Sequence, residues 1–178
     1  MNRAKLLAAC LFVAVAAGGC ATRTEVFLQN AHREKFALEP DELETVQFFI
    51  NKQIVAREDG AAEGAGAVII VEEGTRGAAV EVGPRWLRVS FSEGGRGVPF
   101  VAVDTRSGES AYWLATEVEG EPGFHPVKNV PGRLLRVDGQ VFRLVSGAST
   151  RLLISSNDLD KLVEQRTHLG GRKPESSP

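Results

Sequence analysis

The residues of this chain that most often bind metals are scattered. It has three histidines, His32, His125 and His168. None has a second histidine or a cysteine at the spacing of a zinc motif, whereas a zinc site takes three or four nitrogen, sulfur or oxygen ligands. We therefore expect neither a metal site nor a cofactor, and interpret the three as polar surface residues.

Serines and carboxylates are the other candidates for catalysis. Ser146 and Ser149 border a glycine-containing turn, but no G-x-S-x-G frame surrounds either serine. Glu117, Glu119 and Glu121 alternate along a stretch that could be a strand. Two carboxylates on one face could hydrolyse a glycosidic bond, whereas acids along a solvated edge have no such role. The solvated edge is the favoured interpretation, so no catalytic residue is predicted and a protein that is not an enzyme is favoured.

Tryptophan and arginine occur where a binding face could form. The stretch from Trp86 to Phe91 alternates, with Trp86 and Arg88 on the face opposite Leu87. Trp113 lies in a later strand-like stretch. Since Trp and Arg are favoured at binding hot spots, Trp86, Arg88 and Trp113 form the predicted binding face. The favoured interpretation is nevertheless that both tryptophans close the two ends of a barrel core, or that this face of the sheet is itself covered.

The N-terminus has the pattern of an export signal. Arg3 and Lys5 precede an apolar run from residue 6 to residue 17, and small residues then lead to Cys20. A run of about a dozen residues is too short for a transmembrane helix, which needs about 20.

The residues Ala17, Gly18, Gly19 and Cys20 resemble the cleavage motif of bacterial lipoproteins, although leucine is commoner where Ala17 stands. The resemblance implies cleavage between Gly19 and Cys20 and a diacylglyceryl group on the Cys20 sulfur. The alternative motif that ends at Cys10 leaves too short an apolar run after Lys5. In that family an aspartate after the cysteine retains the protein at the inner membrane, so alanine at that position implies the periplasmic face of the outer membrane in a Gram-negative cell.

The composition is that of one globular domain. Removal of the first 19 of the 178 residues leaves 159, and the net charge of −2 becomes −4 once Arg3 and Lys5 are lost. No basic footprint for nucleic acid is present. We expect a signal peptide at 1–19, an anchor and tether at 20–38, a β-rich domain at 39–166 and a flexible tail at 167–178. Within the tether, residues 26–28 could form a short strand or a segment that docks on the domain.

Short apolar runs separated by glycine-rich turns predict a mainly β fold. The clearest element is a hairpin at 134–145, in which Asp138-Gly139 forms the turn and Val137 pairs with Gln140. A strand at 46–57 carries apolar residues on both faces and is expected to be central or bent at 51–53. The strand at 98–103 contains Pro99 and is predicted to be an edge strand. With a short N-terminal helix and a short C-terminal helix, the pattern favours a small antiparallel barrel or sandwich.

The favoured function is therefore a lipid-anchored envelope protein that acts as a non-enzymatic interaction or structural module. The expected partners are the membrane, through the lipid, and an envelope protein or glycan. A glycan hydrolase with paired carboxylates and a lipid-binding carrier with an apolar cavity are the alternatives.

Overall fold

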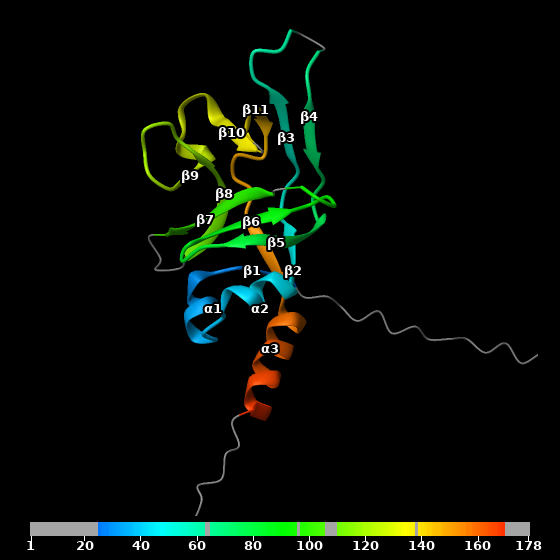
Figure 1. Cartoon of the computed structure of the whole chain (residues 1–178), viewed down its shortest axis with the longest axis vertical. Helices are drawn as coiled ribbons and strands as arrows, with labels where there is room; N and C mark the ends of the chain where they lie inside the picture. Colours follow the sequence, from blue (N-terminus) through cyan, green and yellow to red (C-terminus); the bar gives the residue numbers. More distant parts are fainter. Residues whose placement is uncertain (1–24, 63–64, 96, 106–109, 138, 170–178) are drawn as a thin grey trace, which may run out of the picture.

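A computed structural model describes residues 25–62, 65–95, 97–105, 110–137 and 139–169 (Figure 1). The predicted signal peptide, Cys20 and nearly all of the predicted tail lie outside these residues. None of the described helices is both long and apolar enough to span a bilayer.

The fold consists of two antiparallel sheets and three α-helices, so the prediction of a mainly β fold is confirmed. The larger sheet has eight strands in the order β1-β12-β2-β5-β6-β7-β8-β9, and the smaller has the order β10-β11-β3-β4. The strands are β1 (Glu25–Phe27), β2 (Gln47–Ile50), β3 (Ile54–Glu58), β4 (Val68–Val71), β5 (Arg76–Val82), β6 (Trp86–Ser90), β7 (Val98–Asp104), β8 (Ser110–Glu117), β9 (Phe124–Pro126), β10 (Leu134–Val137), β11 (Gln140–Ser146) and β12 (Leu152–Ser155).

The larger sheet curls until β8 approaches β1 and β12 again. Two isolated bridges, Gln29 with Ala111 and Trp113 with Arg151, join β8 to the segments beside those strands. Among the described residues no continuous ladder closes either sheet. The arrangement is therefore sandwich-like rather than a closed barrel. The core is filled by large side chains with no exposed surface, including Phe48, Phe100, Tyr112, Leu114 and Ile154.

The stretch predicted as one strand at 46–57 forms two strands that belong to different sheets. β2 pairs with β5 and β12 in the larger sheet, whereas β3 pairs with β4 and β11 in the smaller. The bend expected at 51–53 is therefore the point where the chain passes from one sheet to the other. Apolar residues occur at both odd and even positions of this stretch because β2 and β3 pack against different neighbours.

The predicted hairpin is confirmed in its register. Val137 pairs with Gln140 and Leu135 with Phe142, with the turn between β10 and β11. The alternate side chains of the two strands are buried on one face, namely Leu135, Val137, Phe142 and Leu144. The local turn sequence and the alternation therefore specify this element without help from the rest of the chain.

The prediction for Pro99 is wrong, because β7 lies inside the larger sheet between β6 and β8. Proline lacks the N–H that a ladder uses. Pro99 pairs with Arg88 of β6, but the ladder between β7 and β8 begins only at Phe100. The proline thus lies just beyond the end of one of its two ladders, so an interior strand accommodates it.

The helices are α1 (Asn30–Lys35), α2 (Pro40–Thr45) and α3 (Ser156–Leu169). α2 and α3 confirm the two predicted short helices: Pro40 occupies the first turn of α2, where a missing N–H costs nothing. Leu43 of α2 is fully buried, and Leu159 and Leu162 of α3 are nearly so.

The folded domain begins earlier than the sequence suggested. Residues 25–38, predicted as part of the tether, form β1 and α1, and β1 pairs with β12 at the edge of the larger sheet. Leu28 is 0% exposed and Leu38 is 7% exposed. The backbone N–H of Leu28 also donates to the carbonyl oxygen of Leu152 at 3.1 Å. This segment is therefore part of the core.

Leu28→Ala should consequently destabilise the domain. Removal of a fully buried leucine side chain leaves a cavity and lowers the free energy of unfolding by about 2–5 kcal/mol. Urea denaturation followed by far-UV circular dichroism measures the change. Glu25→Ala, at an exposed position of the same segment, should shift the free energy by less than about 0.5 kcal/mol. Equal stability of wild type and Leu28→Ala would show that the segment is a tether after all.

Candidate functional site

The structure places the predicted binding residues on one face of the larger sheet. Trp86 of β6 pairs with Val101 of β7, which in turn pairs with Trp113 of β8. Cross-strand partners share a face, so the two tryptophans lie in one row across three strands. Arg88 lies two residues along β6 on the same face. All three side chains are partly buried, because other parts of the chain pack on them.

The cover of this face comes from β9 and the 3-10 turn η1 (Val127–Asn129). The ring of Phe124 packs against Trp86 with centroids 4.9 Å apart. Lys128 places its Nζ 3.4 Å from the centroid of the Trp113 ring. The centre of this face is therefore covered by β9 and η1. The two tryptophans of the candidate binding face contact other parts of the same chain.

Trp113 lies between two cations. Besides Lys128, the guanidinium of Arg151 is 5.3 Å from the Trp113 ring centroid and 3.6 Å from that of Phe27. Such contacts contribute about 0.5–2 kcal/mol each. The indole Nε1 of Trp113 is buried and has no hydrogen-bond partner among the described residues. Trp113 of β8 therefore contacts η1 through Lys128 and the residue before β12 through Arg151. Two cations of the same chain already lie against its ring.

Arg88 is the centre of an ion-pair network on the same face. Its guanidinium lies 3.0 Å from Glu81 of β5 and 2.6 Å from Glu117 of β8, and 5.0 Å from the ring centroid of Phe124. The Arg88 side chain is only 19% exposed. Two carboxylates and one ring satisfy this cation, so it is not available to an external anion.

The three alternating glutamates line an open pocket of about 510 Å³ at the end of β8. Each has its own basic neighbour: Glu117 pairs with Arg88, Glu119 lies 3.7 Å from Arg136, and Glu121 lies 3.3 Å from Nε2 of His125. All three carboxylate side chains are more than half exposed. A glycosidase needs two carboxyl groups of different acidity that face one glycosidic bond. The three glutamates instead each lie beside a different basic side chain.

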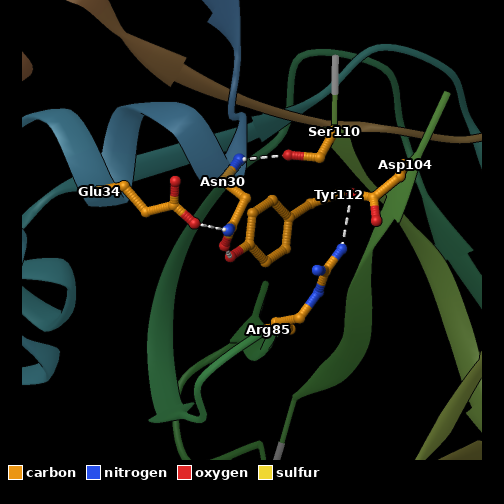
Figure 2. Close-up of polar contacts among 6 residues, drawn as sticks. All are labelled: Asn30, Glu34, Arg85, Asp104, Ser110 and Tyr112. Atoms are coloured by element: carbon orange, nitrogen blue, oxygen red, sulfur yellow. Dashed lines mark hydrogen bonds and ion pairs between the residues drawn. The ribbon is translucent and has the colours of Figure 1, made fainter. Parts of the chain in front are cut away.

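A polar cluster that the sequence did not indicate fastens α1 to the larger sheet (Figure 2). Tyr112 is fully buried, and its hydroxyl accepts a hydrogen bond from Nη1 of Arg33 at 2.9 Å. The same Nη1 donates to the carbonyl oxygen of Gly83 at 2.8 Å. Asn30 approaches the phenol from the other side, with its Oδ1 3.4 Å from the Tyr112 hydroxyl, and its backbone N–H donates to Oγ of Ser110 at 2.9 Å.

The Tyr112 phenol and the nearby Arg85–Asp104 ion pair differ in their environment. Burial raises the pKa of Tyr112 above its ordinary value, more than the Arg33 hydrogen bond and charge lower it. Arg85 and Asp104, also drawn in Figure 2, form a 2.7 Å ion pair whose side chains are both about half or more exposed. The hydrogen bonds of Asn30 and Arg33 thus form a clasp between α1 and β8.

Arg33→Met tests this clasp. The substitution keeps a long apolar side chain but removes the charged donor from a buried phenol, so the free energy of unfolding should fall by about 1–3 kcal/mol. In the Tyr112→Phe background the same substitution should cost less, and the double-mutant cycle isolates the coupling. Lys35→Met, at an exposed position of the same helix, is the matched control. Additive effects of Arg33→Met and Tyr112→Phe would contradict the clasp.

The histidines remain apart in the structure. His32 lies in α1, His125 in β9 and His168 near the end of α3. Within the described part of the chain no group of three potential metal ligands forms. His32 has a structural contact instead: its Nδ1 accepts the backbone N–H of Gln29 at 3.4 Å as part of a capping box. Burial, with a smaller contribution from Lys35, lowers the pKa of His32 below its usual 6.5.

The His32 pKa predicts a pH dependence of stability. Below pH 6.5 the unfolded chain binds a proton at this site more readily than the folded chain, so stability falls as the pH decreases until the folded histidine is also protonated. His32→Gln keeps an acceptor for the cap and does not titrate. From pH 7.5 to pH 5.5, the urea midpoint of the wild type should fall further than that of His32→Gln. Parallel decreases in both proteins would contradict the assignment.

Comparison with other proteins gives no relative: no protein-family model, no curated protein and no solved structure matches this chain.

Proposed function

We propose that this chain is a lipid-anchored, non-enzymatic interaction or structural module on the periplasmic face of the outer membrane. The observation that carries the proposal is the order of the first twenty residues: Arg3 and Lys5, an apolar run, small residues and Cys20. Two or three acyl chains on one N-terminus hold a protein at a bilayer far more firmly than a single chain does.

The start of the folded domain supports a position close to the membrane. β1 begins at Glu25, and only residues 21–24 separate it from Cys20. Five Cα-to-Cα steps span at most about 18 Å. Glu25 pairs with Ser155, directly before α3, so the lipid is tied to the end of the domain that carries β1 and α3. In Figure 1 the hairpin of β3 and β4 extends from the opposite end, where it would project away from the bilayer.

The contacts of the acidic residues favour binding over hydrolysis. Glu117 and Glu121 lie at ion-pair distance from Arg88 and His125. A catalytic acid must hold a proton at neutral pH, and for that it is usually buried or placed beside another carboxylate. Both side chains are more than half exposed, and Glu117 is held by the Arg88 guanidinium, which favours its charged form. They suit electrostatic contact with a partner in the envelope, either a protein or a glycan.

Cys20→Ser provides the test of the anchor. The substituted protein should lose incorporation of labelled palmitate, keep its uncleaved N-terminus and leave the outer-membrane fraction. Cys10→Ser is the matched control, because it removes the only other cysteine of the chain and should leave lipidation intact. Intact-mass spectrometry of the N-terminal peptide and membrane fractionation measure both effects. An unmodified Cys20 in the wild-type protein, or normal lipidation of Cys20→Ser, would refute the proposal.

A further inference from the structure

The free edge of β4 has the geometry of a peptide-binding strand. β4 is the last strand of the smaller sheet and pairs only with β3 among the described residues. The N–H of Glu58 donates to the carbonyl oxygen of Ala67, and Glu58 and Ala67 continue the register that pairs Ala56 with Ile69. Hydrogen-bonded and non-hydrogen-bonded pairs alternate along an antiparallel ladder. The N–H and C=O groups of Val68 and Ile70 therefore face away from β3, toward the free edge.

A groove of about 420 Å³ runs along this edge. Residues 68–72 of β4 and its end form one wall, and Phe91, Gly97 and Val98 of the turn between β6 and β7 form the other, with Val137 also lining it. Val68 and Ile70 are 48% and 57% exposed and are among the most exposed large apolar residues of the described chain. An extended peptide in this groove would hydrogen-bond to β4 and bury apolar side chains at once.

The sequence of β4 lacks the features that normally protect an edge strand. Such strands usually carry a lysine, a proline, a bulge or a covering loop that prevents further pairing. β4 consists of four aliphatic residues, and its ladder with β3 has a regular register. An edge of this kind is either a site of aggregation or a site of strand addition.

One end of the groove has a charge. Among the described residues that line it, Glu72 alone is charged, and its Oε2 accepts a hydrogen bond from Gln53 at 2.6 Å. No cation pairs with Glu72 among the described residues. A lysine or arginine at the matching end of a bound peptide would be attracted to this carboxylate.

We propose that β4 binds an extended segment of a partner protein by strand addition, with aliphatic side chains at alternate positions and a cationic residue beside Glu72. A second copy of this chain is a poorer occupant. Antiparallel pairing of two β4 strands turns one copy end over end, and β4 extends from the end opposite β1 and α3 (Figure 1). This part of the argument rests on the proposed function, because two anchors on short leashes would then point in opposite directions.

The test uses the processed chain with Cys20→Ser and a capped, fluorescent peptide, Lys-Thr-Val-Thr-Ile-Thr, whose valine and isoleucine lie opposite Ile70 and Val68. Its N-terminal lysine lies beside Glu72 when the peptide adds antiparallel to β4. Fluorescence anisotropy should show saturable binding. Ile70→Pro removes an outward N–H that the ladder with β3 does not use, so it should weaken binding about tenfold or more. Circular dichroism and the thermal midpoint verify that each variant folds.

Three matched variants separate the contributions. Ile70→Thr keeps the β-branched shape and the backbone N–H and should weaken binding much less than Ile70→Pro. Val145→Thr alters an equally exposed residue of β11 that does not line the groove, and should bind like the wild type. Glu72→Lys should weaken binding of the lysine peptide about two- to fivefold and strengthen binding of its glutamate counterpart.

Two results would overturn the inference: no saturable binding by the wild type, or the same affinity for Ile70→Pro. Concentration-dependent dimerisation that Ile70→Pro abolishes would also overturn it and assign the edge to a second copy. The assay needs no lipid, so its failure leaves the anchor untouched. Conversely, normal peptide binding by a protein whose Cys20 is never lipidated would refute the proposed function alone.

Discussion

The two sheets depend on one crossing, where two stretches of chain pass between them side by side. The chain also changes sheets between β4 and β5 and between β9 and β10, but the two passages that lie side by side are at residues 51–53, from β2 to β3, and at residues 147–151, from β11 to β12. The N–H of Asn51 donates to the carbonyl oxygen of Arg151, and the Asn51 side chain accepts the N–H of Arg151 at 2.6 Å. Gly147 has φ +92°, and a Cβ there would lie 2.6 Å from the carbonyl oxygen of Gln53. Only glycine allows the two passages to approach so closely, so the relation between the sheets is fixed at this point.

Local features of the sequence were enough for some elements and not for others. The hairpin of β10 and β11 follows from its turn residues and alternation, and Pro40 marks the start of α2. The assignment of β2 and β3 to separate sheets depends on the distant passage at 147–151, which no local pattern reveals. The interior position of β7 depends on where the ladder with β8 begins. The same holds for α1, whose side chains and backbone form hydrogen bonds with Tyr112, Gly83 and Ser110, about 50 to 80 residues away.

The tryptophan face shows that alternation can place a side chain on a face without showing what covers that face. Alternation placed Trp86 and Arg88 on the outer face of β6, and the structure agrees. The sequence between β8 and β10 contains Phe124 and Lys128, but its irregular composition gave no sign that it folds back over that face. The aromatic and cationic residues that could have bound a partner bind each other instead. The unpaired backbone of β4 is a different kind of surface, because side-chain composition alone does not show which strand lies at an edge.

The attachment of β1 to the domain also determines how the domain would respond to a pulling force. A chain held by its N-terminus receives any pull between membrane and partner at Glu25. β1 is attached to β12 through three residue pairs, which would separate readily if the load peeled them one after another. The hydrogen bonds from Arg33 to Tyr112 and Gly83 lie directly behind that short strand. They would receive the force next, so that the clasp at α1 sets how much tension the domain can bear before its core opens.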